Sequence, residues 1–561
     1  MTPLQPISRR NFLQFVSVSA ALAVLSEACS AAAPNSTSGS AATPPASNAP
    51  LLPAYVAFQG PPPDVSGSQD GLVPPAYLNY PRNPTRSVQQ PVGNGEEITA
   101  VTYTTQAPPT PVEQNPAWQR VNQELGVKVN LPLTQLADYP TKLNTIIAGG
   151  ALPDLLSLGA GNGAGIANLP EFLQSQCTDL TSLVSGDAIK AYPNLAALPP
   201  YAWRNAVFNN RVYAVPSVRA SISAAILFGK GKLLDPVGGI NFKDSDNFLK
   251  VLQQLTVGGS QWGIGATSGA PTNGIPGMAT FFLESFGAPN IWREANGKLT
   301  KDWETDEFKA AIAFVRKLWD AGVVHPDTPT ASVNQAAQNF YAGKYALWSN
   351  GLVIGDTVWN RANAQDPDFG MRAVPPFPAN PSSKPVHFLG TGANLLTVMK
   401  STTPEQAKKL LGVLNYLSAP FGTQEYLTMW YGVEGSEFDF DANGNPVVSP
   451  KGQTDLFIPW PNVGAGASVL YNASAPEYAR VMAKDIAVIQ GMGIQNPVVG
   501  LYSKTNAQKA ATLNQKMGDG LLAIIFGRED VSTLDQLVKD WRAQGGDQIR
   551  SEFEQALQTS A

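Results

Sequence analysis

The stretch "EEITAVTY" (96–103), followed at a short distance by "NPAWQRVNQELGVKVNL" (115–131), decides the fold of this chain. β-Branched residues alternate with other residues through the first of these segments, which is typical of a strand. In the second segment, Asn115 can cap a helix whose first position is Pro116, and Gly126 ends that helix before a second strand pattern begins. The two segments therefore predict a strand, a helix and a strand in succession.

The same alternation continues along the chain. A further helix pattern covers Tyr139–Ala148 and ends at two glycines, after which "LPDLLSL" (152–158) predicts a third strand. This strand leads into a glycine-rich loop, Gly159–Gly165. Strands that alternate with helices of this length predict βαβ units and a parallel sheet, whose ligands lie beyond the carboxyl ends of the strands. The sequence therefore predicts an α/β fold.

The remainder of the chain is long and rich in helix signals. In "TDEFKAAIAFVRKLWDAG" (305–322) apolar residues recur at helical spacing, and Thr403–Gln406 forms a capping box that opens another helix. The 466 residues after Gly95 are too many for one ordinary core and suit two large lobes.

The N-terminal stretch "SRRNFLQFVSVSAALAVLSEAC" (8–29) resembles an export signal. Its apolar run is shorter than a membrane span and is interrupted by polar residues, while two arginines precede it as in a twin-arginine signal. Its end, "LSEAC", resembles a lipoprotein box in which Cys29 is acylated after cleavage; cleavage by an ordinary peptidase near 31–33 is the alternative. Residues 1–28 are therefore predicted to be a signal peptide with a lipobox-like end.

Residues 29–95 are rich in proline, alanine, serine and glycine. Such a composition does not repay the entropy of folding, so it predicts an extended tether. Several aromatic residues lie between Tyr55 and Tyr80, and part of the segment is alternatively expected to pack on the folded body.

Composition excludes several classes of protein. The net charge is −5, without the clustered positive charge of a nucleic-acid-binding protein, and no later run has the length of a membrane span.

If Cys29 is acylated or removed, Cys177 has no disulfide partner. Cys177 is interpreted as a small buried residue, because neither histidine, His325 or His387, stands in a recognisable motif with it.

No motif points to catalysis, a cofactor or a metal. The glycine-rich loop lacks the lysine of a P-loop, no Gly-x-Ser-x-Gly occurs, and no pair of carboxylates is singled out by spacing. "DFDANGNP" (439–446) matches the first half of a calcium loop, but Pro450 stands where a bidentate glutamate is required. Asn443-Gly444 is therefore interpreted as a hairpin turn.

Five tryptophans lie near glycine, proline or asparagine, outside strongly periodic helices. Aromatic rings can stack on the apolar faces of sugars, although a lone tryptophan is more often a core residue. The five are Trp292, Trp348, Trp359, Trp430 and Trp460.

Four stretches together resemble the extracellular solute-binding proteins of ABC importers, most closely the large lipoprotein subgroup associated with oligosaccharides. They are "FNNRVYAVP" (208–216), "FYAGKYALWSNG" (340–351), "AKKLLGVLNYLSAPFGTQEYLTMWYGVEG" (407–435) and "IIFGREDVSTLDQLVKDWRAQGGDQIRSEFEQAL" (524–557). The resemblance extends from about Glu96 to the C-terminus.

This resemblance implies a two-lobed periplasmic-binding-protein fold of type II, in which each lobe is a mixed sheet flanked by helices. The implied lobes are 96–217 with 350–398, and 218–349 with 399–561. The implied chain crossings between them are Val215–Ser223, Ala346–Gly351 and Gly392–Thr403.

The resemblance also implies ligand-binding residues in the cleft between the lobes. Aromatic platforms are expected first at Trp292 and then at Trp430, and contacts at a crossing from Trp348 and Asn350; Tyr103 and Asn162 lie at strand ends and could supply hydrogen bonds. Where relatives often carry an acidic calcium loop, after a helix like "SDNFLKVLQQL" (245–255), this chain continues "TVGGSQWGIG", so no metal is expected.

The predicted function is therefore capture of a sugar or oligosaccharide and its delivery to an ABC permease. The protein is expected to be a monomer on the outer face of the cytoplasmic membrane, anchored by lipid on Cys29, with no cofactor, no catalytic activity and no nucleic-acid partner. A secreted carbohydrate-active hydrolase or lyase is the main alternative, and a binding module for adhesion or sensing is a third.

Overall fold

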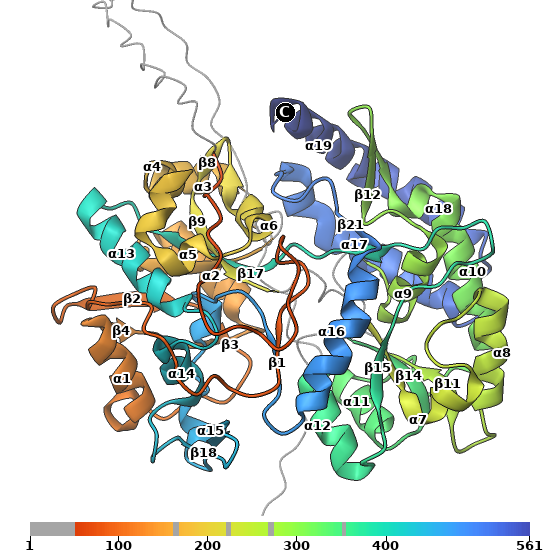
Figure 1. The fold of residues 1–561 in the computed structure, drawn as a ribbon. Helices are drawn as coiled ribbons and strands as arrows, with labels where there is room; N and C mark the ends of the chain where they lie inside the picture. The colour runs from red at the N-terminus through yellow and green to blue at the C-terminus, as the bar shows by residue number, and fades with distance from the viewer. Residues whose placement is uncertain are drawn as a thin grey trace, which may run out of the picture. The chain divides into compact units, whose positions relative to one another are not determined.

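The predicted strands of the first lobe assemble into one five-stranded sheet in the computed structural model (Figure 1). The structure describes residues 51–160, 166, 168–219, 226–267, 274–350 and 355–560, without the side chains of residues 350, 355–358 and 560. The predicted signal peptide, the acylation site at Cys29 and the predicted ligand contact Asn162 lie outside the described residues. The described elements belong to one compact unit, Ala49–Ala561.

The first sheet has the strand order β4-β2-β6-β17-β9. Its strands are β2 (Glu97–Val101), β4 (Lys128–Asn130), β6 (Leu155–Gly159), β9 (Ala214–Val218) and β17 (Ala393–Met399). β2 pairs in parallel with β4 and β6, as the βαβ pattern predicts, whereas β17 is antiparallel to β6 and β9. The sheet is therefore mixed.

The helix between β2 and β4 forms for the reasons visible in the sequence. In α1 (Pro116–Leu125) the side-chain oxygen of Asn115 accepts a hydrogen bond from the backbone N–H of Trp118 at 2.9 Å. Gly126 ends the helix with a φ of 69°, a left-handed conformation that glycine adopts without steric cost. The predicted start and end of this helix are confirmed.

Further helices and short strands complete the first lobe around this sheet. The helices are α2 (Tyr139–Gly149), α3 (Leu169–Gln176), α4 (Thr181–Val184), α5 (Pro193–Ala196), α6 (Pro200–Trp203), α13 (Pro404–Leu417), α14 (Gln424–Tyr431) and α15 (Gly452–Asp455). The strands are β3 (Tyr103–Thr104), β5 (Thr134–Gln135), β7 (Val207–Phe208), β8 (Arg211–Val212), β18 (Phe438–Phe440) and β19 (Pro446–Val448). Residues such as Leu125, Leu156 and Leu410, each at most 1% exposed, form its core.

A second sheet has the strand order β11-β14-β10-β15 and a core on each face. Its strands are β10 (Ile226–Lys230), β11 (Trp262–Gly265), β14 (Tyr345–Asn350) and β15 (Met371–Val374). Ile226 and Phe228 enter one core and Leu227 enters the other, because successive side chains of a strand point to opposite faces. The two sheets thus define two lobes.

Helices cover both faces of the second sheet. One face packs against α11 (Val333–Tyr341), α12 (Gly355–Gln365) and α16 (Pro476–Gln490). The other packs against α8 (Ser245–Leu255), α9 (Gly277–Phe286), α10 (Asp306–Asp320), α17 (Lys504–Ile525), α18 (Thr533–Trp541) and α19 (Asp547–Ser560). The remaining elements are α7 (Gly231–Leu234), β1 (Ala76–Tyr77), β12 (Trp292–Ala295), β13 (Lys298–Lys301), β16 (His387–Phe388), β20 (Leu470–Tyr471) and β21 (Gly493–Ile494).

The chain passes from one sheet to the other between β9 and β10, and again between β15 and β17. Of the predicted crossing Val215–Ser223, residues 215–218 belong to β9 and residues 220–223 lie outside the described residues. The chain does not cross at Ala346–Gly351, because β14 lies inside the second sheet and β15 then adds to the free edge of β10. A last passage leads from the turn at Trp460–Asn462 to β20.

These strand and helix positions divide the chain differently from the predicted lobe boundaries. Within 350–398, α12 and β15 pack with the second sheet and only β17 joins the first. Within 399–561, α13 packs in the first core, since its apolar face covers the first sheet.

Residues 51–95 pack on the folded body, so the prediction of an extended tether does not hold for this part of 29–95. β1 pairs in parallel with β20, and Tyr80 is 1% exposed, with its ring centroid 4.9 Å from that of Phe421. The aromatic residues of this segment explain the difference, because burying a large ring supplies the free energy that proline-rich sequence alone lacks.

Two smaller interpretations are confirmed. Cys177 is buried, and burial raises the pKa of its thiol to about 12, which leaves it protonated and unreactive at neutral pH. β18 and β19 form an antiparallel hairpin around Asn443-Gly444, with the backbone N–H of Asn443 donating to the Asp441 carboxylate. In the described ranges, none of the helices combines the length and apolar character needed to cross a bilayer.

Candidate functional site

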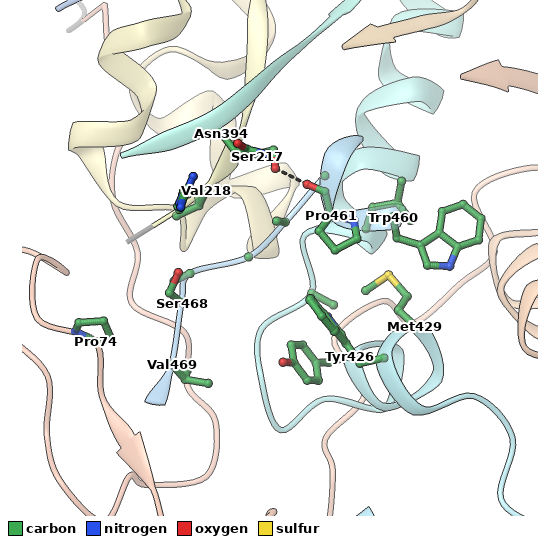
Figure 2. A pocket seen from close by; sticks show the side chains of 18 of the residues that line it. Pro74, Ser217, Val218, Asn394, Tyr426, Met429, Trp460, Pro461, Ser468 and Val469 are labelled. Carbon is green, nitrogen blue, oxygen red and sulfur yellow. Dashed lines mark hydrogen bonds between the residues drawn. The ribbon is translucent and has the colours of Figure 1, made fainter. Parts of the chain in front are cut away.

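A pocket of about 570 Å³ lies where the edge of the first sheet meets elements of the second lobe. Ser217 and Asn394 come from adjacent strands of the first sheet, whereas Tyr478 comes from α16, which packs in the second lobe. Figure 2 shows Ser217 and Asn394 on one side of the pocket and Tyr426 from α14 on another. The volume is in the range of sites that hold small organic ligands.

One wall of the pocket is the segment 460–470, which crosses the first sheet. Hydroxyl groups from three neighbouring strands hold it in place: Ser157 of β6 donates to the carbonyl oxygen of Asn462 at 2.8 Å, and Thr397 of β17 donates to that of Val463 at 2.6 Å. Ser217 of β9 donates to the carbonyl oxygen of Pro461. All three hydroxyl-bearing residues are at most 1% exposed, so these hydrogen bonds form out of water and fix the segment.

Asparagine side chains form a polar edge beside this wall. The amide nitrogen of Asn394 lies 3.4 Å from the hydroxyl of Tyr103 and 3.4 Å from the side-chain oxygen of Asn462. The amide nitrogen of Asn462 donates to the backbone oxygen of Tyr103 at 2.9 Å. Asn394 and Asn462 line the pocket and are only partly buried, which suits side chains that also bond a ligand's hydroxyl groups.

Aromatic side chains form the opposite wall. Tyr426 and Trp430 lie one turn apart on α14, and their rings stack with centroids 5.5 Å apart and planes inclined by 23°. Trp430 is 46% exposed, an unusual exposure for so large an apolar ring, and Met429 and Tyr431 line the pocket beside it. The wall therefore presents flat apolar surface to the pocket.

Arg219 is the only charged residue among the described residues that line the pocket. Burial lowers the pKa of its guanidinium below the ordinary value, while the nearby Tyr103 opposes this effect. The group nevertheless stays positively charged at neutral pH, because an arginine does not lose its proton in proteins.

Two of the six predicted contact residues lie at this site. Trp430 lines the pocket, and Tyr103 lies directly behind the polar edge through its contact with Asn394. Trp460, one of the five tryptophans noted in the sequence, also lines the pocket but is 2% exposed and packs edge-on against Trp118. Trp460 therefore forms part of the buried base of the pocket.

Two other candidates, Trp292 and Trp348, lie elsewhere. Trp292 is 4% exposed, packs against Trp541 and Phe553, and borders a separate cavity of only about 70 Å³. Trp348 is 1% exposed and packs against Phe340 in the second lobe. Asn350 is the last residue of β14, paired with Ile226. Trp292 and Trp348 are not among the residues that line the pocket of 570 Å³, and the side chain of Asn350 lies outside the described part of the structure.

Sequence reasoning missed Asn394, Asn462, Tyr426 and Arg219. Asn462 could have been found, since "WPNVGAGAS" (460–468) combines tryptophan, proline and asparagine with closely spaced glycines, a pattern of a loop packed against other backbone. A Cβ on Gly466 would lie 2.8 Å from the backbone oxygen of Ser418, so the segment needs glycine there. The remaining three carry no local signal.

Comparison with known families gives one match that spans more than half of the chain. The model of the bacterial extracellular solute-binding proteins matches residues 117–433. Among curated proteins, the polygalacturonan/rhamnogalacturonan-binding protein YtcQ of Bacillus subtilis is 24% identical over 460 residues, which cover 79% of this chain and 89% of that protein. Lipoprotein LipO of the same organism is 22% identical and covers 81% of this chain and 91% of its own length.

Solved structures of low sequence identity share the fold. An HMO-binding, ABC-transporter-associated solute-binding protein of Bifidobacterium longum infantis has a TM-score of 0.63 at 14% identity, covering 83% of this chain and 99% of that one. The alginate-binding protein AlgQ2 has a TM-score of 0.60 at 15% identity, covering 84% and 100%. These likenesses show the two-lobed fold.

Proposed function

Because the chain belongs to the bacterial extracellular solute-binding proteins, we propose that it captures an oligosaccharide in the pocket between its lobes and delivers it to an ABC transporter. The observation that carries the proposal is the pairing of two surfaces across one cavity, the stacked rings of Tyr426 and Trp430 and the amides of Asn394 and Asn462. Sugars have apolar ring faces and hydroxyl edges, so they fit such a pair of surfaces.

Relatives support the same ligand class. The names of YtcQ and AlgQ2 refer to polygalacturonan and alginate, which are both carbohydrates. Proteins of this family bind and do not transform their ligands, and the pocket of this chain presents no nucleophile paired with a base among its described residues. We infer that this protein has no catalytic activity.

Transport requires that ligand binding change the arrangement of the two lobes. A ligand favours one arrangement only to the extent that it binds that arrangement better. Asn394 belongs to the first lobe and Tyr478 to the second, and both line the pocket. A sugar bound to Asn394 therefore gains contacts with Tyr478 when the two lobes approach each other. The proposed mechanism is therefore capture followed by closure, with the closed form presented to the permease.

We further propose that the protein acts outside the cytoplasmic membrane as a lipid-anchored monomer. The twin-arginine-like segment at 8–29 supports export, and the lipobox-like end supports acylation of Cys29. The relative LipO carries the word lipoprotein in its name. Labelling of growing cells with a fatty-acid analogue tests this: the wild type should take up label and Cys29→Ser should not.

Isothermal titration calorimetry with a panel of oligosaccharides tests the capture function. We expect one saccharide bound per protein, with the sugar recovered unchanged by chromatography afterwards. Shortened or rearranged products would identify a hydrolase or a lyase, and the absence of heat with any saccharide would contradict sugar capture. The variant Asn462→Ala should weaken binding, whereas Asn380→Ala, at an exposed turn outside the pocket, should not.

A further inference from the structure

Arg219 is fixed at the point where the chain leaves the first sheet. Its backbone N–H donates to the carbonyl oxygen of Gly392 at 3.0 Å, and the preceding Val218 donates to that of Ala465 at 3.3 Å. Both anchors belong to segments next to the pocket, the approach to β17 and the wall formed by 460–470. The side chain therefore starts from a rigid position on the polar edge of the pocket.

The charge of Arg219 has no counterpart in the described part of the molecule. Among the described residues it forms no ion pair, and its buried Nε atom has no hydrogen-bond partner. The described pocket lining holds no aspartate or glutamate. The sequence that follows, "ASISAA" (220–225), also contains no carboxyl group. Among the described residues, the positive charge of Arg219 in the pocket is thus not compensated.

Other partly buried arginines of this protein are compensated. Arg372 binds the carboxylate of Asp485 through two hydrogen bonds of 2.8 Å each, and Arg550 lies 2.6 Å from a carboxylate oxygen of Glu304. Removing a charge from water is costly unless a partner replaces the lost hydration, so buried charges in proteins are normally paired. Among the described residues, Arg219 departs from that rule, and it lines a pocket in which a ligand can supply the partner.

We propose that the captured saccharide carries a carboxylate and that Arg219 binds it, so that the pocket selects acidic over neutral sugars. This inference rests on the proposed capture of oligosaccharides. A guanidinium presents parallel N–H donors that match the two oxygens of a carboxylate, and a hydrogen bond to a charged group is stronger than one between neutral groups. Trp430 and Tyr426 would take the apolar face of the sugar ring, and Asn394 and Asn462 its hydroxyl groups.

Sugar carboxylates occur in uronic acids and in sialic acids, and calorimetry with two matched pairs of probes separates the sources. The first pair is trigalacturonate and the galactotriose of the same linkage, in which each carboxylate is replaced by a hydroxymethyl group. The second pair is sialyllactose and its primary amide, in which the carboxylate is replaced by a neutral carboxamide. We expect the acidic member of one pair to bind about 10- to 100-fold more tightly than its neutral partner, the range that one charge-assisted contact supplies.

Variants at Arg219 tie that preference to this residue. Arg219→Gln should remove the preference for the acidic probe and leave binding of its neutral partner within about threefold, while Arg219→Lys should retain part of it because the charge remains. Arg542→Gln removes one charge from a half-exposed arginine outside the pocket and should keep the full preference. Thermal melts of each variant, compared with the wild type, establish that it is folded.

The outcomes are distinct. A preference for an acidic probe that disappears in Arg219→Gln and persists in Arg542→Gln supports the proposal, and the pair that shows it identifies the sugar as a uronic or a sialic acid. Equal or tighter binding of the neutral members, or a preference that survives Arg219→Gln, overturns the proposal but leaves saccharide capture intact. No binding of acidic or neutral probes in the full oligosaccharide panel would contradict saccharide capture itself.

Discussion

Trp430 and Trp348 each follow an apolar residue and have a small residue within two positions, yet they occupy opposite environments. Trp430 lies near the C-terminal end of the helix α14, lines the pocket and is 46% exposed. Trp348 lies in β14, is 1% exposed and packs against Phe340. The difference arises from the elements that carry them. α14 has one face turned to a cavity, while β14 lies between two other strands with a core on each side.

This contrast shows why the sequence alone does not separate a candidate binding residue from a core residue. Sequence shows only that a ring is present, and its role depends on which segments far away in the chain cover it. In the second lobe, Trp292 is covered by Trp541 and Phe553, more than two hundred residues further along. In the first lobe, the residues that approach Trp430 leave a cavity.

The largest expected effect is the loss of stability on replacing Trp348, the buried tryptophan. Trp348→Ala removes a fully buried indole and should lower the free energy of unfolding by about 3–5 kcal/mol. Urea unfolding followed by circular dichroism measures this loss. Trp430→Ala is the matched control and should change stability by less than about 1 kcal/mol, because its ring is already half in water. A stable Trp348→Ala variant that has lost ligand affinity would show that Trp348 is a binding residue and not a core residue.

A second effect concerns the support behind the aromatic wall. Asn445 is 1% exposed, and its side-chain oxygen accepts hydrogen bonds from the backbone N–H of Tyr80 at 2.8 Å and from the hydroxyl of Tyr471 at 3.0 Å. Asn445→Ala leaves both donors without this acceptor and should cost about 1–3 kcal/mol of stability in the same unfolding measurement. Asn443→Ala, at the exposed turn of the hairpin, should cost less than about 1 kcal/mol. Equal losses in the two variants would show that Asn445 does not support the wall.

Trp430, the exposed tryptophan, should contribute to ligand affinity. Trp430→Ala is expected to weaken the affinity for the bound saccharide about tenfold, the effect of losing one stacking surface, while Trp430→Phe should recover most of it. Calorimetric titration of both variants measures the change. Unchanged affinity in Trp430→Ala would remove α14 from the site.

The smallest expected effect concerns Glu552 of the second lobe and the way the stability of the protein decreases in acid. Burial raises the pKa of Glu552, but hydrogen bonds from Ser503, Thr505 and Gln548 outweigh it and lower the pKa to about 2. Since the folded value lies below the ordinary value of 4.5, the carboxylate contributes stability that is present above pH about 4.5 and is lost as the pH falls toward 2.

Glu552→Gln should therefore lower stability at neutral pH and flatten its decrease in acid. Urea unfolding of the variant and the wild type across that pH range makes the comparison, with Glu294→Gln, an exposed glutamate of β12, as the control. An acid dependence identical to that of the wild type would show that these hydrogen bonds to α19 contribute nothing measurable.

Much of the fold could be predicted from the sequence, because the signals that form its elements are local. The cap at Asn115, the glycine at Gly126 and the alternation in β2 act within a few residues of themselves, and the structure has each of them. The lobe boundaries follow from strand pairing over long distances, such as that of β15 with β10, which no local pattern specifies.

The candidate site was harder to predict for the same reason. Tyr103, Asn394 and Asn462 meet through hydrogen bonds although more than 350 residues separate the first from the last. Arg219 is one of many charged residues in the sequence, and it is distinguished by lining the pocket without an ion pair among the described residues. Trp430 was predicted through a family resemblance, which carries information about tertiary contacts that composition and periodicity do not contain.

A crystal structure of the protein with the saccharide that binds most tightly in calorimetry tests the central claim most directly. The account predicts one intact sugar in the pocket between the lobes, with a ring face against Trp430 and Tyr426 and hydroxyl groups on Asn394 and Asn462. A sugar bound outside this pocket, for example beside Trp292, or a cleaved sugar within it, would contradict the account.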